Sequence, residues 1–195
     1  RSRMEQAIAN ARRNGGQVAL LFVDLDNFKS INDSLGHAAG DHFLQQVVSR
    51  LLASVRQTDV VSRQGGDEFL VGITDLAKGE VVSTVAEKIL IHMAKPFVVH
   101  GTELTSSCSI GIAVFPDNGD SFETLLRHAD ISVYHAKEDV RNTWRFYDET
   151  MNTQMQEDLQ MVAGLRQALA GGELLLYYQP VLDLASGQVI GAEAL

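Results

Sequence analysis

Cysteine, extended apolar stretches and positive charge are all scarce in this sequence. A single cysteine, Cys108, excludes a disulfide within the chain, which fits a reducing cytosol. It lies in the apolar run CSIGIAVF, which favours a small buried residue over a catalytic thiol. No apolar run approaches the roughly 18 residues that span a bilayer, so we expect a soluble, cytoplasmic segment. Because Arg1 resembles the middle of a longer polypeptide, a membrane anchor or sensor upstream in the full-length protein stays open.

The scarcity of positive charge limits the partners. Sixteen Lys and Arg residues against 25 Asp and Glu give a formal net charge of −9. That balance argues against binding a nucleic-acid backbone, so we expect no nucleic-acid partner. An anion bound here needs a metal ion or a local cluster of cations. The length of 195 residues predicts one complete domain plus a piece of another.

Hydrophobic periodicity predicts alternating strands and helices. The near-continuous apolar run Gln17–Asp26 is typical of a strand buried on both faces. The glycine pair Gly65-Gly66, between two apolar stretches, predicts a β-hairpin turn. The order β, α, β, β, α, β with an additional helix predicts an α+β fold with a ferredoxin-like antiparallel sheet and packed helices. The predicted strands are Gln17–Asp26, Asp59–Ser62, Glu68–Ile73 and Thr105–Phe115, and the predicted helices are Met4–Arg13, Phe43–Val55, Val81–Met93 and Phe122–Tyr134.

The pattern changes after Tyr147. A stripe of Met and Leu side chains from Met151 to Leu169 predicts a connecting helix that docks on a second domain. Two strand-like runs follow, Glu173–Gln179 and Gln188–Leu195, with a turn between them. We therefore expect three parts: residues 1–148, a connecting helix at 149–172, and the start of a second domain at 173–195.

Four carboxylates follow strand ends. Asp24 and Asp26 close the first strand, and Asp67 and Glu68 lie on the hairpin turn, so pairing these strands brings them together. Mg²⁺ prefers such hard oxygen ligands and commonly shares its shell with substrate phosphates, which indicates a nucleotide substrate. Gly65-Gly66 would let a phosphate approach the backbone closely. Taken alone, these residues are most simply a good hairpin turn.

Longer motifs resemble one family. The segment RQGGDEF (Arg63–Phe69) resembles the signature of the GGDEF diguanylate cyclases, and DLDNFKSINDSLGHAAGD (Asp24–Asp41) resembles their upstream motif. Two further segments, TSSCSIGIAVFP (Thr105–Pro116) and HADISVYHAKEDVRN (His128–Asn142), follow in the family's order. The resemblance implies the nucleotide-cyclase-like palm of that family. One departure is Val140, where the family usually has glycine.

The resemblance implies roles at the metal and the guanine base. Asp24, the backbone carbonyl of Leu25, Asp67 and Glu68 would hold Mg²⁺ or Mn²⁺. Asn32 and Asp41 would bind guanine, because a carboxylate accepts from the N1 and amino groups while an amide donates to O6. The alternative for these two residues is a turn residue and a helix N-cap.

The resemblance also implies the reaction. Lys29, Lys137 and Arg141 would contact the GTP phosphates beside Gly65 and Gly66 and offset developing charge; the alternative is ordinary solvated charges. The 3′-oxygen of one GTP attacks the α-phosphate of another and pyrophosphate leaves, with Asp67 as candidate base and Glu68 and Lys29 beside it. Each domain of the family holds one GTP, so forming cyclic di-GMP requires a homodimer.

A regulatory site is implied as well. Arg56 and Asp59 resemble the family's RxxD inhibitory site, where cyclic di-GMP binds and holds domains unproductively. An arginine can pair bidentately with phosphate or guanine. The alternative is an arginine at a helix end with a nearby salt bridge.

The last segment resembles the start of an EAL phosphodiesterase domain. Within ELLLYYQPVLDLASGQVIGAEAL (Glu173–Leu195), Gln179 matches a substrate contact and Glu193 a metal ligand. The alternative is a plain β-hairpin. Because the rest of that domain is missing, we expect this truncated segment not to hydrolyse cyclic di-GMP, and we expect an EAL domain in the full-length protein.

Three hypotheses stand at this point. The first is an active, product-inhibited diguanylate cyclase. The second is a catalytically silent GTP-binding module that controls an adjoining EAL phosphodiesterase. The third is a purely structural dimerisation domain, which leaves the carboxylate cluster hard to explain.

Overall fold

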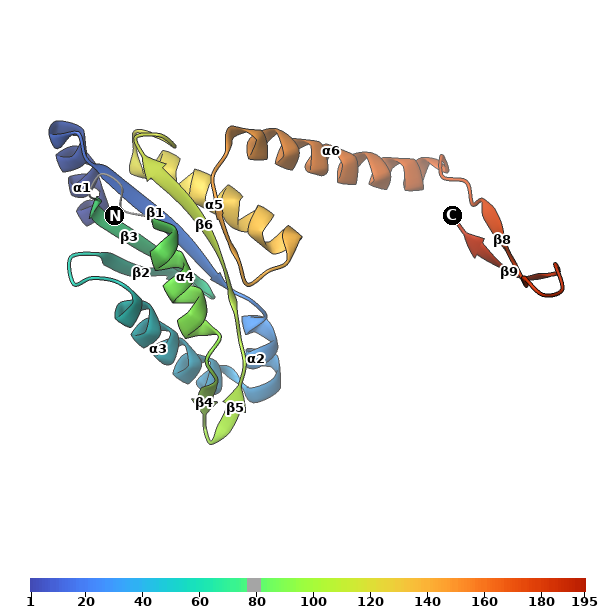
Figure 1. The fold of residues 1–195 in the computed structure, drawn as a ribbon, viewed down its shortest axis with the longest axis horizontal. Helices are drawn as coiled ribbons and strands as arrows, with labels where there is room; N and C mark the ends of the chain where they lie inside the picture. The colour runs from blue at the N-terminus through green and yellow to red at the C-terminus, as the bar shows by residue number, and fades with distance from the viewer. Residues whose placement is uncertain (77–81) are drawn as a thin grey trace. The chain divides into compact units, whose positions relative to one another are not determined.

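A computed structural model describes residues 1–76 and 82–195, in two compact units, Arg1–Asn152 and Thr153–Leu195 (Figure 1). Val81, expected in a helix, lies outside the described residues, as do the side chains of Asp139 and Leu159. Within the described part of the chain, no helix has both the length and the apolar character that a membrane crossing requires.

The first unit is built on a five-stranded sheet. Its order is β2-β3-β1-β6-β7, in which β1 pairs antiparallel with β3 and β6, while β7 adds a parallel edge strand beside β6. The order of the first four strands is that of the ferredoxin-like arrangement, so the predicted fold class is confirmed. The strands are β1 (Gln17–Leu25), β2 (Val60–Gly65), β3 (Glu68–Leu76), β6 (Cys108–Phe115) and β7 (Trp144–Phe146).

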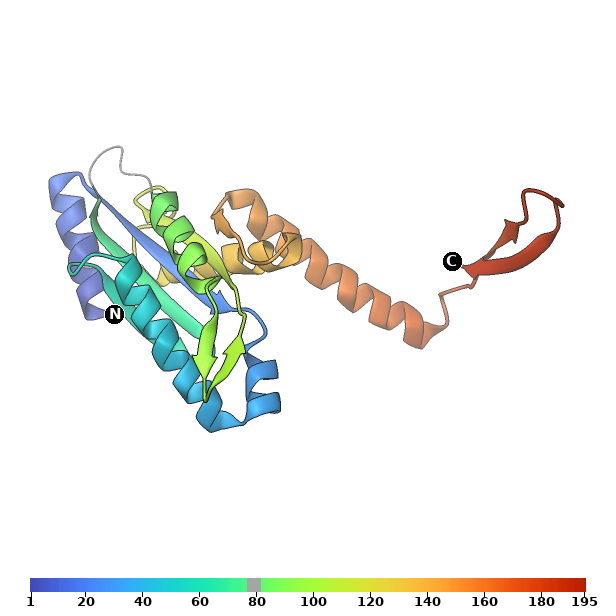
Figure 2. The same cartoon turned by 60° about the horizontal axis from the view of Figure 1, so that its bottom comes forward.

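Helices cover both faces of this sheet, and the two views show α3 and α4 on one face and α1 and α5 on the other (Figures 1 and 2). The central strand β1 is therefore buried on both sides, as its apolar sequence predicted. Leu21 and Val23 belong to the core shared with α3 and α4, while the alternate residues Leu20 and Phe22 are buried on the opposite face. The helices are α1 (Ser2–Asn14), α2 (Phe28–Leu35), α3 (His37–Ser54), α4 (Val82–Met93) and α5 (Phe122–Asp139).

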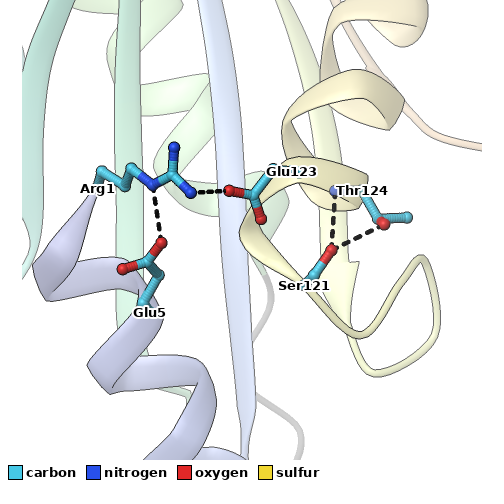
Figure 3. A network of polar contacts seen from close by, with 5 residues as sticks. All are labelled: Arg1, Glu5, Ser121, Glu123 and Thr124. Carbon is cyan, nitrogen blue, oxygen red and sulfur yellow. Dashed lines mark hydrogen bonds and ion pairs between the residues drawn. The ribbon is translucent and has the colours of Figure 1, made fainter.

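The start of α5 is fixed by polar contacts (Figure 3). The Ser121 hydroxyl accepts a hydrogen bond from the Thr124 backbone N–H at 3.2 Å, which caps the helix and contributes about 1 kcal/mol. Arg1 bonds Glu5 in α1 at 2.8 Å and also reaches Glu123 in the first turn of α5. Lys137 lies in the last turn of α5, at the opposite end of the helix from these contacts.

Four short elements were not predicted. Helix α2 is only eight residues long and mostly polar, so it lacks an extended apolar stripe. Strands β4 (Phe97–Val99) and β5 (Thr102–Leu104) form a small hairpin, and β7 has three residues. The strand predicted to begin at Thr105 begins at Cys108 instead. Strands this short are defined by their pairing partners, which periodicity does not identify.

Helix α6 (Glu149–Gly171) begins in the first unit and continues into the second. The second unit ends in a two-stranded hairpin. The hairpin pairs β8 (Tyr178–Leu182) with β9 (Val189–Ala194). The strand predicted at Glu173–Gln179 is wrong in position, because backbone pairing begins at Tyr177, opposite Leu195. An apolar run satisfies strand propensity, but a strand forms only where it has a partner.

Candidate active site

The sheet places the expected oxygen ligands side by side. The β1–β3 register pairs Asp24 with Glu68, and the Leu25 backbone N–H donates to the Asp67 carbonyl at 3.2 Å. Residues directly opposite on antiparallel strands project from the same face, with Cβ atoms about 5 Å apart. The end of β1 and the turn between β2 and β3 therefore form one continuous surface of carboxylates and backbone.

The turn itself is closed by a residue that the sequence argument did not single out. The Arg63 guanidinium donates two hydrogen bonds to the Gly66 carbonyl, from Nε at 3.0 Å and from Nη2 at 2.7 Å. Gly66 adopts a left-handed φ of 48°, which favours glycine. Both Gly65 and Gly66 are exposed, and their Cα atoms face open space. The turn is thus held in one shape while its backbone stays open to a ligand.

A polar cavity of about 140 Å³ lies at this point. The expected phosphate-binding cations Lys29, Lys137 and Arg141 line it together with the carboxylates of Asp24 and Asp67. Its remaining lining residues are Leu25, Asp26, Asn27 and Phe28. Residues from β1, the β2–β3 turn, α2 and the end of α5 thus meet at a single site.

Lys137 forms an ion pair with Asp24 inside this cavity. Its Nζ lies 2.7 Å from Asp24 Oδ2. Burial raises the pKa of the Asp24 carboxyl; the ammonium of Lys137 opposes that shift, and the nearby carboxylates of Asp67 and Asp26 add to it. Asp24 therefore already pairs with the single positive charge of Lys137, and a partly buried carboxylate of this kind is also suited to a divalent cation.

The donor set fits Mg²⁺ or Mn²⁺. It consists of hard oxygens: the carboxylates of Asp24, Asp67 and Glu68 and the carbonyl of Leu25. Among the described residues, no three acidic, histidine or cysteine side chains converge into a complete metal site. Mg²⁺ commonly binds through one or two carboxylates together with substrate phosphates, and of the three carboxylates only Asp24 and Asp67 line the cavity. The fourth expected carboxylate, Asp26, accepts hydrogen bonds from serine hydroxyls instead.

The two expected guanine contacts lie on neighbouring helices. Asn32 is inside α2, and Asp41 is inside α3 on the exposed side. The Asn32 side chain packs against Gly40, so it lies next to the residue that precedes Asp41. Helix α3 begins at His37 with Gly36 as its N-cap residue. The alternatives of a turn residue and a helix N-cap are therefore wrong.

The departure from the family pattern at Val140 is compatible with the local backbone. Val140 has a φ of −141°, a conformation open to any residue, and its side chain is 85% exposed. The left-handed conformations fall on Arg141 and Asn142, with φ of 50° and 47°. The Arg141 N–H donates to the Ala136 carbonyl at 3.2 Å, which holds Arg141 at the end of α5.

Comparison with known proteins identifies the family. Residues 1–143 match the family described as "Diguanylate cyclase, GGDEF domain". The chain belongs to the GGDEF family. It is 42% identical over 193 residues to MucR of Pseudomonas aeruginosa, named as a bifunctional diguanylate cyclase/cyclic di-GMP phosphodiesterase, covering 99% of this chain and 28% of MucR. It is 36% identical over 167 residues to the diguanylate cyclase TpbB of the same species, covering 85% of this chain and 38% of TpbB.

Solved structures agree with the GGDEF assignment. The GGDEF domain of TpbB from Pseudomonas aeruginosa superposes with a TM-score of 0.77 at 37% identity, covering 80% of this chain and 91% of that one. An EAL/GGDEF domain protein from M. capsulatus has a TM-score of 0.67 at 45% identity, covering 73% and 92%. The chain spans well under half the length of the curated relatives MucR and TpbB.

A second cavity of the GGDEF domain contains the expected inhibitory residues. It measures about 320 Å³ and is lined by Arg56, Asp59 and also Lys88 of α4, which sequence reasoning missed. The buried Asp59 carboxylate accepts backbone N–H groups from Arg56 at 2.8 Å and from Thr74 at 3.2 Å. Asp59 thus shapes the turn that presents Arg56, while Lys88 adds a cation from another element. No sequence signal pointed to Lys88, because only packing brings α4 to this turn.

In the second unit, Gln179 and Glu193 lie directly opposite each other. They are cross-strand partners in the β8–β9 hairpin, and both are exposed. Directly paired residues project from the same face of a hairpin. The hairpin therefore presents both residues expected of an EAL segment on one surface.

Proposed function

We propose that this GGDEF domain is a diguanylate cyclase that condenses two GTP molecules into cyclic di-GMP and releases pyrophosphate. The observation that carries the proposal is the shared cavity of Asp24, Asp67, Lys29, Lys137 and Arg141 at the end of β1. Acidic oxygens that suit a divalent cation and three cations that suit phosphates lie within one small space. A hairpin turn alone does not account for that arrangement.

The residues divide the chemistry among them. Mg²⁺ or Mn²⁺ held by Asp24, the Leu25 carbonyl, Asp67 and Glu68 would polarise the phosphate and lower the pKa of the ribose hydroxyl. Lys29, Lys137 and Arg141 place positive charge where the triphosphate and the leaving pyrophosphate carry negative charge. Asp67 is the candidate base for the 3′-hydroxyl proton, and Asn32 and Asp41 orient guanine.

Product formation needs two such domains. Each supplies one GTP, so a homodimer with facing sites brings the 3′-oxygen to the opposite α-phosphate. The cavity of Arg56, Asp59 and Lys88 is the proposed product site for feedback inhibition. A guanidinium can bond phosphate or guanine in a bidentate manner there, and the ammonium of Lys88 adds charge.

The proposed domain order is a cyclase domain at residues 1–148, a connecting helix at 149–172 and the start of an EAL domain at 173–195. The alignment with MucR, whose name includes both activities, covers 99% of this chain and supports that order. The opposed pair Gln179 and Glu193 supports the EAL assignment of the hairpin.

A second candidate is a catalytically silent GTP-binding module that regulates an EAL domain. It is favoured by NbdA of Pseudomonas aeruginosa and PdeR of Escherichia coli, both named as cyclic di-GMP phosphodiesterases, which align with 97% and 98% of this chain. In that case the site binds GTP without turnover.

The test is cyclic di-GMP formation from GTP and Mg²⁺, with GTP binding measured in parallel. We expect product from the parent chain and none from Asp67→Ala, with GTP binding largely kept. Val140→Gly serves as a matched control near the site, because its side chain is exposed. Binding without product in the parent would establish the silent module, and absence of GTP binding would exclude both candidates.

A further inference from the structure

Asp26 is a buried carboxylate that the proposed chemistry does not use. It is 5% exposed, and its Oδ2 and Oδ1 accept hydrogen bonds from the hydroxyls of Ser107 at 2.5 Å and Ser109 at 3.1 Å. Its backbone N–H donates to the Ser107 carbonyl at 2.9 Å, and its own carbonyl accepts from the Ser106 hydroxyl at 3.3 Å. Both the side chain and the backbone of Asp26 are thus hydrogen-bonded to residues 106–109, at the start of β6.

The burial of this carboxylate calls for a counter-charge. An ionised carboxylate inside a protein is costly unless it is paired with a cation, and neutral hydroxyls compensate only part of that cost. Among the described residues, Asp26 has no ion pair with Lys, Arg or His. It does line the 140 Å³ cavity in which Asp24 and Lys137 meet. Lys29, Lys137 and Arg141 line that cavity as well, so the charge that compensates Asp26 can come from them and from a cation at the proposed metal site two residues earlier in the chain.

Asp26 also contributes to the hydrogen bonds that hold the end of β1 in place. Pairing with β3 reaches Asp24 opposite Glu68, and beyond it Leu25 makes one bond, to the Asp67 carbonyl. On the other side, pairing with β6 continues through Leu25 opposite Cys108, and the hydrogen bond from the Asp26 N–H to the Ser107 carbonyl extends it by one residue. Fastening Asp26 to Ser107 and Ser109 fixes the peptide unit between Leu25 and Asp26, which contains the Leu25 carbonyl.

We propose that Asp26 is a positioning residue for the catalytic metal. Its carboxylate, held by Ser107 and Ser109, orients the Leu25 carbonyl and the Asp24 carboxylate, and its negative charge adds to the attraction for a divalent cation without ligating it. The inference rests on the proposed cyclase function, because the metal is the one that function requires. A purely structural tie between β1 and β6 is the competing explanation, and it predicts no effect on metal binding once the protein is folded.

The test measures Mn²⁺ binding without catalysis. Free Mn²⁺ is followed by electron paramagnetic resonance during titration of the protein with 3′-deoxy-GTP, which lacks the attacking hydroxyl. Asp26→Asn keeps the size and a hydrogen-bond acceptor but removes the charge, and we expect a loss of Mn²⁺ affinity of about 10- to 100-fold. Ser109→Ala keeps the charge and loosens the anchor, so we expect a smaller loss.

Ser121→Ala is the matched control. It removes the cap of α5 at a stability cost of about 1 kcal/mol, far from the metal, and Mn²⁺ affinity is expected to stay unchanged. Folding of each variant is checked by circular dichroism, and Ser109→Ala carries the test if Asp26→Asn does not fold. Parent-like Mn²⁺ binding by the folded variants would overturn the role of Asp26. No Mn²⁺ binding by the parent would instead overturn the metal site and the proposed function with it.

Discussion

Gly40→Ala is expected to weaken GTP binding while leaving the fold intact or more stable. A Cβ atom at Gly40 would lie 1.9 Å from Asn32 Oδ1 and 3.0 Å from Asn32 Cγ, but at an ordinary 3.5 Å from Phe28. Relieving the clash to an ordinary contact of 3.4 Å moves the Asn32 oxygen by about 1.5 Å. The clashing atoms belong to the end of a side chain, so the amide gives way and the backbone does not.

The size of the effect follows from one hydrogen bond. A shift of that size stretches a bond of about 2.9 Å beyond useful range, so the proposed amide contact with guanine O6 is lost. The net contribution of such a bond is about 0.5–1.5 kcal/mol, which corresponds to a rise of about 2- to 12-fold in the dissociation constant of GTP. Alanine inside a helix is favoured over glycine by about 0.5–1 kcal/mol, so binding and stability change in opposite directions.

The assay combines calorimetric titration with 3′-deoxy-GTP and thermal unfolding by circular dichroism. Gly164→Ala is the matched control, because Gly164 lies within α6 and a Cβ there meets nothing within 4 Å. Asn32→Ala should lose a similar factor, and adding Gly40→Ala to it should cost little more, since both changes remove the same contact. Unchanged GTP affinity in Gly40→Ala beside a clear loss in Asn32→Ala would show that a Cβ at Gly40 does not displace the Asn32 amide.

Three further outcomes follow from the same structure. Burial raises the pKa of the Asp24 carboxyl, so the folded, metal-free protein binds the carboxyl proton more tightly than the unfolded chain does. The free energy of unfolding therefore falls as pH rises from about 3.8 through the raised pKa of the folded state. Asp24→Asn should remove this pH dependence from thermal unfolding curves, raise the melting temperature at neutral pH and abolish cyclic di-GMP formation. A lower melting temperature at neutral pH would contradict this. Val140→Gly should leave the rate of cyclic di-GMP formation within about twofold, since Val140 already has a φ of −141°; a large gain would show that valine distorts the site. Burial raises the pKa of the Cys108 thiol, so iodoacetamide at pH 8 should modify it only after unfolding in urea, and labelling of the native protein would disprove its burial.

Local sequence patterns were enough to predict much of the fold. The apolar run ending in Asp24 predicted a doubly buried strand because a central strand covered on both faces needs apolar residues at every position. The glycine pair Gly65-Gly66 predicted the hairpin, because a tight turn favours residues without Cβ. Helix α2 was missed because its apolar side chains, Phe28, Ile31 and Leu35, cover only two turns, which is too short a pattern to stand out in the sequence.

Strand and helix periodicity and the longer motifs are local along the chain, so they sufficed to predict the fold class and the family and to name the candidate carboxylates and cations. Which of those residues lie in contact depends on how the strands and helices pack. The β1–β3 register places Asp24 opposite Glu68, and the packing of α5 brings Lys137 to within 2.7 Å of Asp24. At the start of β6, the hydroxyls of Ser107 and Ser109 bond the Asp26 carboxylate. Those contacts join residues 40 or more positions apart in the chain, and their geometry depends on how sheet and helices pack, which no local pattern records.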